Sequence, residues 1–93
     1  MLGFQPPKWK IVQHRWLRWS EQIYSNTVWE GSRKKQAKGE AKSLFISHLS
    51  MMLKHNLFSD DTLLEEENFT CILFDDEGPW YMIWYEIIGP IAE

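Results

Sequence analysis

The sequence predicts a small single-domain α+β protein, built from two main helices and a C-terminal antiparallel β-hairpin. Two observations support this fold class: apolar residues recur at helical spacing in two segments, about residues 9–23 and 41–57, and two β-type runs separated by a turn follow them. A chain of 93 residues can bury one hydrophobic core, and no internal repeat or composition break divides it. We therefore expect residues 1–93 to form one domain.

The first predicted helix covers about residues 8–25 and follows the dipeptide Pro6-Pro7. Proline fixes φ and restricts the residue before it, so an irregular lead should end there. At 100° per residue, five apolar side chains then fall within an arc of about 80°. These side chains are Trp9, Val12, Trp16, Trp19 and Ile23. The pattern is typical of an amphipathic helix with one aromatic face.

The second predicted helix covers about residues 40–57, where apolar residues from Ala41 to Met52 cluster on one side. The segment before it, residues 31–40, carries four positive charges and no large apolar residue. We expect that segment to be solvated, either as a loop or as the free first turns of the helix. Residues 59–68 combine capping side chains with carboxylates, which favours a short acidic helix or turn.

The predicted hairpin joins strands at about 69–75 and 80–88 through a turn that contains Gly78. Alternation along the second strand places apolar residues on both of its faces, and two helices can cover only one face. An uncovered apolar face and an unpaired edge favour association. We expect self-association or a partner bound through the hairpin, unless the N-terminal lead and the acidic segment wrap over the second face.

Charge is distributed unevenly along the chain. The formal net charge of −3 combines +7 in residues 1–54, which hold all ten Lys and Arg, with −10 in residues 55–93. Charges of opposite sign attract, either within the fold or between copies. A homodimer is therefore the expected assembly.

We expect no catalytic residue, metal site or cofactor. Cys71 lies in an apolar run, where a thiol packs as a small hydrophobic group, and this argues against a nucleophile paired with His48 or His55. These two histidines are seven residues apart, about 10 Å of helical rise, which is too far for one metal ion. The carboxylate runs lack the spacing and glycine of a calcium loop.

The single cysteine and the hydropathy pattern bear on localisation. One cysteine excludes an internal disulfide framework and favours a reducing compartment. No stretch approaches eighteen uncharged apolar residues, so we expect no membrane span. The prediction is a cytoplasmic protein.

The predicted function is a small protein-binding or regulatory module, of the inhibitor or adaptor kind, which uses an aromatic, acidic-tipped hairpin. Tryptophan and tyrosine are enriched at binding hot spots, and carboxylates attract a protein partner with a basic surface. The predicted contact residues are Asp75, Asp76, Glu77, Trp80, Trp84 and Tyr85.

The alternative is a winged-helix-like nucleic-acid-binding protein that uses the basic N-terminal half. The element order of helix, basic connector, helix and hairpin matches that of winged-helix binders only coarsely, and basic side chains would release counterions from phosphates. The residues predicted for this role are Arg15, Arg18, Arg33, Lys34, Lys35 and Lys38. The net negative charge and the acidic hairpin tip argue against it.

Overall fold

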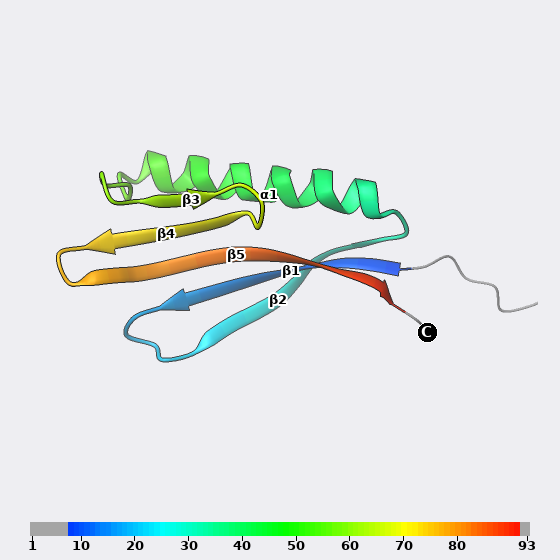
Figure 1. Ribbon diagram of the computed structural model, residues 1–93, viewed down its shortest axis with the longest axis horizontal. Coiled ribbons are helices and arrows are strands. Elements are labelled where there is room, and N and C mark those ends of the chain that lie inside the picture. The colour runs from blue at the N-terminus through cyan, green and yellow to red at the C-terminus, as the bar shows by residue number, and fades with distance from the viewer. Residues whose placement is uncertain (1–7, 92–93) are drawn as a thin grey trace, which may run out of the picture.

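The computed structural model of the protein describes residues 8–91, and in it one long helix packs on a five-stranded antiparallel sheet (Figure 1). The strand order is β2-β1-β5-β4-β3, so β5 is central and β2 and β3 are the edges. In chain order the elements are β1 (Lys8–Leu17), β2 (Ile23–Gly31), α1 (Lys34–Lys54), β3 (Leu63–Glu65), β4 (Thr70–Asp75) and β5 (Gly78–Ile91). The predicted fold of two main helices and a hairpin is therefore wrong.

The segment predicted as a helix over 8–25 forms β1 and the start of β2, which pair with each other. Val12 and Trp16 helped to set the helical pattern, but a spacing of four residues also places two side chains on one face of a strand. The segment is rich in Trp, Ile and Val, which suit a pleated surface. β1 also pairs with β5, on the side away from β2, and these long-range contacts favour a strand over a helix for β1.

The single helix α1 begins at Lys34, earlier than the predicted start near 40, and ends at Lys54. Residues 34–40 of the basic segment thus form the first turns of this helix, which was one of the two expectations for the segment, whereas Gly31 ends β2. Ala37, Ala41 and Phe45 are buried at four-residue spacing, which faces one stripe of the helix toward the sheet. Within residues 8–91, no helix is both long enough and apolar enough to cross a membrane.

The acidic segment 59–68 does not form a helix. Its residues Leu63–Glu65 form β3, which pairs with β4 from Leu63 opposite Ile72 to Glu65 opposite Thr70. The C-terminal strands also do not stand apart as a hairpin, because β4 pairs with β3 and β5 pairs with β1. The second run is apolar on both faces, but α1 covers only one of them: Ile83 and Tyr85 lie on the covered face, whereas Met82 and Trp84 lie on the face that α1 leaves open.

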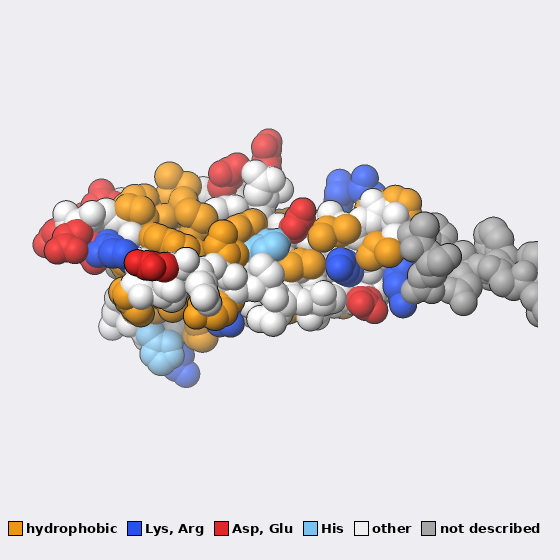
Figure 2. Space-filling model, turned by 90° about the horizontal axis from the view of Figure 1, so that it is seen from below, with side chains coloured by type: hydrophobic (Ala, Val, Ile, Leu, Met, Phe, Trp, Pro, Cys, Tyr) orange, Lys and Arg blue, Asp and Glu red, His pale blue; other side chains and the backbone are white. Residues whose placement is uncertain are grey.

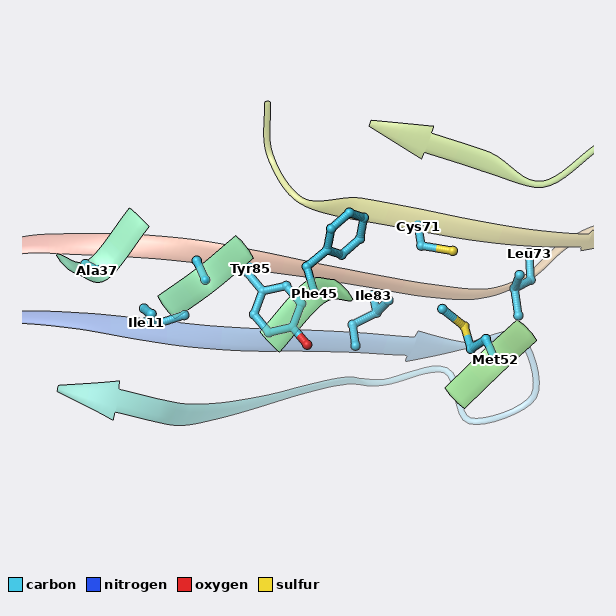
Figure 3. Packing of buried hydrophobic residues seen from close by; sticks show 9 residues of the cluster. Ile11, Ala37, Phe45, Met52, Cys71, Leu73, Ile83 and Tyr85 are labelled. Carbon is cyan, nitrogen blue, oxygen red and sulfur yellow. The ribbon is translucent and has the colours of Figure 1, made fainter. Parts of the chain in front are cut away.

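The hydrophobic core lies between α1 and one face of the sheet (Figure 3). Every strand except the two edge strands contributes a buried side chain. Its members are Ile11, Ala37, Ala41, Phe45, Met52, Cys71, Leu73, Ile83 and Tyr85. No residue of α1 contributes a buried charged group, so this layer is held by apolar packing.

Candidate protein-binding site

The β1–β2 connection and the β4–β5 turn lie at the same end of the sheet. We call residues 18–22 and 75–80 together the turn end. In Figure 1 both turns lie at the left, and α1 begins at the opposite end. Figure 2, which looks from the side of β2, shows hydrophobic side chains gathered toward the left end, with acidic and basic side chains at its tip.

Arg18 joins the two turns. Its guanidinium donates two hydrogen bonds to the Asp75 carboxylate, at 3.0 and 2.7 Å, and one to Glu77 at 3.2 Å. It also donates to the backbone carbonyls of Gly78 and Pro79, at 2.8 and 3.1 Å. A planar guanidinium suits this bidentate geometry. The two turns are therefore held in a fixed relation to each other.

The acidic tip is partly neutralised by this contact. Asp75 and Glu77 form ion pairs with Arg18, whereas Asp76 forms no ion pair with any residue of the described range 8–91. Hydrogen bonding from Arg18, assisted by the backbone N–H of Glu77, lowers the pKa of the Asp75 carboxyl. Asp76 and Glu21 are the carboxylates of the turn end that remain available to a partner.

A pair of tryptophan rings covers the turn end. The rings of Trp19 and Trp80 stack with centroids 6.0 Å apart and planes 8° apart. Trp80 is half-buried and contacts the Tyr81 ring, with centroids 5.8 Å apart, while Trp19 is 69% exposed. A hollow of about 380 Å³ beside the stack is lined in part by Ser20 and Tyr24. The outer ring is thus a large apolar surface held on a fixed inner ring.

The structure brings together four of the six predicted protein-binding residues: Asp75, Asp76, Glu77 and Trp80 lie at the turn end. Trp84 lies farther along β5, and Tyr85 is buried at 4% exposure in the core. Adjacent residues of a strand point to opposite faces, so Trp84 and Tyr85 cannot act together. The hydroxyl of Tyr85 accepts a hydrogen bond from Gln13 at 2.9 Å and donates one to the Leu44 carbonyl at 3.5 Å.

Sequence reasoning did not select Trp19. The helical pattern placed it on the same buried face as Trp16, whereas the structure places it in the turn that follows β1. The polar residues after it, Ser20-Glu21-Gln22, were the available signal for a turn.

Trp84 belongs to a second cluster, on the sheet face that α1 does not cover. Its ring stacks on His14, with centroids 5.1 Å apart. The two imidazole nitrogens lie 2.7 Å from Ser25 Oγ and 2.9 Å from Glu86 Oε1. Serine, imidazole and carboxylate are also the groups of a hydrolase triad, but Ser25 and Glu86 are exposed on an open sheet and do not enclose a dry cleft. We interpret the cluster as a cross-strand network that orients Trp84.

The basic residues predicted to contact nucleic acid do not gather on one surface. Arg18 is engaged at the turn end, and Arg15 lies opposite Ile83 on the face of the sheet that α1 covers. Arg33, Lys34, Lys35 and Lys38 lie just before and within the first turns of α1, at the far end of β2. A strand of nine residues spans about 30 Å, so the two groups are far apart.

Other titratable groups do not form a reactive centre. Burial raises the pKa of the Cys71 thiol to about 11, which leaves it protonated at neutral pH. His48 lies 3.0 Å from the Tyr81 hydroxyl, and burial lowers the pKa of its imidazole. In the part of the chain that the structure describes, no three His, Cys, Asp or Glu residues are placed to hold a metal ion.

Comparison of the chain with protein-family models, with curated proteins and with solved structures gave no match. The assignment of a function therefore depends on the geometry of the molecule itself.

Replacing Arg18 with glutamine is expected to raise the pKa of Asp75, because it removes the bidentate hydrogen bonds that favour the carboxylate. A folded-state pKa below the unfolded value stabilises the protein at neutral pH, and this contribution is lost as pH falls through the folded value. In the variant, the stability that Asp75 ionisation contributes at neutral pH should be lost. The measurement is an NMR pH titration of the Asp75 side-chain carbonyl carbon.

Arg33→Gln is the matched control, since it removes the same charge at the opposite end of β2. It should leave the Asp75 titration unchanged. Identical Asp75 titrations in the wild type and Arg18→Gln would contradict the role given to Arg18.

Proposed function

We propose that the protein is a non-enzymatic protein-binding module whose contact surface is the turn end. The observation that supports this most directly is the Trp19–Trp80 stack, in which the outer ring is 69% exposed. Tryptophan is the residue most enriched at binding hot spots, because its burial removes a large apolar area from water. A ring already held by stacking loses little side-chain entropy when a partner covers it.

The charge of the turn end favours a partner with a basic surface. Four carboxylates, of Glu21, Asp75, Asp76 and Glu77, face one guanidinium, that of Arg18. The surface around the stack is therefore net negative. Complementary charge raises the association rate and excludes partners of the same sign.

The hydrogen bonds of Arg18 prepare this surface for binding. They connect the strand that leads to Trp19 with the turn that leads to Trp80, and the Arg18 backbone N–H also donates to the Trp80 carbonyl at 3.0 Å. A surface ordered before binding has a smaller entropy loss on association. The aromatic anchor and its acidic rim are thus presented as one rigid unit.

Nucleic-acid binding by the basic residues stays a prediction that no finding tests. The separation of Arg18 from the residues at the start of α1 argues against one continuous phosphate-binding surface. The winged-helix analogy behind that prediction also does not apply, because residues 8–91 contain one helix and no recognition helix between a connector and a wing.

The test is site-specific photo-crosslinking in the source cells, with p-benzoylphenylalanine placed at Gln22. Gln36 is the matched control, because it is also an exposed glutamine but lies near the start of α1. We expect a covalent adduct with a basic protein from position 22 and none from position 36. The same adducts with a basic protein other than a second copy of this chain, formed from both positions, would contradict a contact surface at the turn end.

Competition then tests the aromatic anchor. An excess of unlabelled wild-type protein should suppress the adduct, and Trp19→Ala should compete at least about tenfold more weakly, as expected for loss of a hot-spot side chain. Leu53→Ala, which truncates a similarly exposed apolar residue on α1, should compete like the wild type. Equal competition by Trp19→Ala would refute the role of the stack.

A further inference from the structure

The strand β2 is an open edge of the sheet. It is the outermost strand in the order β2-β1-β5-β4-β3, and no strand of the described chain pairs with its outer side. It is nine residues long, whereas the opposite edge strand β3 has three. Residues 23–28 are all exposed, and Ile23 is 58% exposed. A long, exposed edge strand presents unpaired N–H and C=O groups that can pair with another strand.

From Ile23 to Thr27 this edge lacks the features that normally prevent such pairing, and Glu30 near its far end is the one charged residue of β2. No charged residue and no proline occurs from Gln22 to Trp29. Natural edge strands are commonly protected by lysine, proline or a bulge. The one bulge of the β1–β2 pair leaves Val28 unpaired near the far end, so Ile23–Thr27 stays a regular strand.

The two ends of β2 carry opposite charge. The strand starts beside the turn end, which contains Glu21 and Asp76, and finishes beside Arg33 and the lysines in the first turns of α1. Figure 1 shows these two regions at opposite ends of the molecule. Antiparallel pairing of two copies places the acidic end of each beside the basic end of the other, whereas parallel pairing places like charges together.

We propose that two copies of this chain associate through β2, in antiparallel register about a two-fold axis at Ser25, and join their sheets into one of ten strands. This register sets Ile23 opposite Thr27 and Tyr24 opposite Asn26 of the second copy, so no charged side chains face each other across the new strand pair. A second copy is the occupant that the charges favour, because each copy supplies both members of the complementary ends. The inference does not depend on the binding role of the turn end.

The first test is the mass in solution, measured by sedimentation equilibrium at low and near-physiological salt. The wild type should sediment at twice the chain mass of 11.2 kDa, with weaker association at higher salt. Ser25→Lys/Thr27→Lys places like charges across the two-fold axis and should weaken dimerisation at least about tenfold. Ser43→Lys/Ser47→Lys adds the same charge at exposed positions on α1 and should remain dimeric. A wild type that is monomeric at hundreds of micromolar would refute the proposal.

Cysteine crosslinking tests the register without relying on the lysine variant. Single cysteines at positions 23–28 are oxidised under mild conditions, with Cys71 buried and inert as background. Crosslinking between copies should be strongest at Ser25 and fall on either side. A dimer that crosslinks from Ile72, on the uncovered sheet face, and at no position of β2 would replace edge pairing with face-to-face stacking.

Discussion

Replacing Ile83 with alanine is expected to lower the free energy of unfolding by about 3–4 kcal/mol, the usual range for removing a large aliphatic side chain from a packed core. Ile83 is fully buried on the central strand β5, opposite Cys71 of β4 and Arg15 of β1. The packing of α1 on the sheet leaves the vacated volume little room to collapse. For a domain of this size the total stability is roughly 5–14 kcal/mol, so this change removes a large part of it.

The measurement is guanidinium unfolding followed by tryptophan fluorescence, at one fixed protein concentration, because any self-association would contribute to stability. Ile46→Ala is the matched control. Ile46 is 49% exposed on α1, and its truncation should cost less than about 1 kcal/mol. Equal losses in the two variants would show that the core is not centred on β5.

The fold was only partly predictable from sequence because its N-terminal segment fits the spacing of a helix and of a strand. Val12 and Trp16 lie four residues apart, a spacing shared by one face of a strand and one face of a helix. The choice between them depends on pairing with Glu86 and Met82 of β5, about seventy positions later in the chain. Local pattern carries no information about a partner strand at that distance.

The candidate site, too, was predictable in part: its local features could be inferred from the sequence, and its long-range contacts could not. That Asp75, Asp76 and Glu77 form an exposed tip followed by a tryptophan can be inferred from local sequence, because a turn with glycine separates two β-type runs. The contact of Arg18 with Asp75 joins residues 57 positions apart, and Trp19 meets Trp80 only because β1 and β5 are neighbours. The contacts that bring the β1–β2 connection to the β4–β5 turn therefore depend on the strand order and not on local sequence.

Burial was predictable where a whole run was apolar. Cys71 lies fully buried on β4, as its apolar neighbours indicated. The sequence could not show that Tyr85 is buried while Trp84 lies on the uncovered face. Both faces of β5 are apolar, and only the position of α1 decides which face forms the core.

Stability is expected to fall steeply as pH rises from about 9 to 12, because buried acidic groups in the core hold their protons more tightly than in the unfolded chain. Burial raises the pKa of Cys71 from 9.0 to about 11 and that of Tyr81 from 10.0 to about 12. Burial also raises the pKa of Tyr85. A folded-state pKa above the unfolded value gives stability that is complete below the unfolded pKa and is lost as pH rises through the folded pKa. Deprotonation therefore favours the unfolded state throughout this window.

The measurement is the guanidinium midpoint at pH 7.5, 9, 10 and 11, with the slope against pH as the readout, because variants also differ in their stability at neutral pH. Cys71→Ala and Tyr81→Phe should each flatten the alkaline slope, since each removes one buried group that must ionise on unfolding. Ile83→Val is the matched control: it alters the same core without removing a titratable group, so the midpoint should fall at every pH while the slope matches the wild type. A wild-type midpoint that stays constant to pH 11 would mean that the thiol and phenols between α1 and the sheet ionise as freely as in the unfolded chain, which a dry core does not allow.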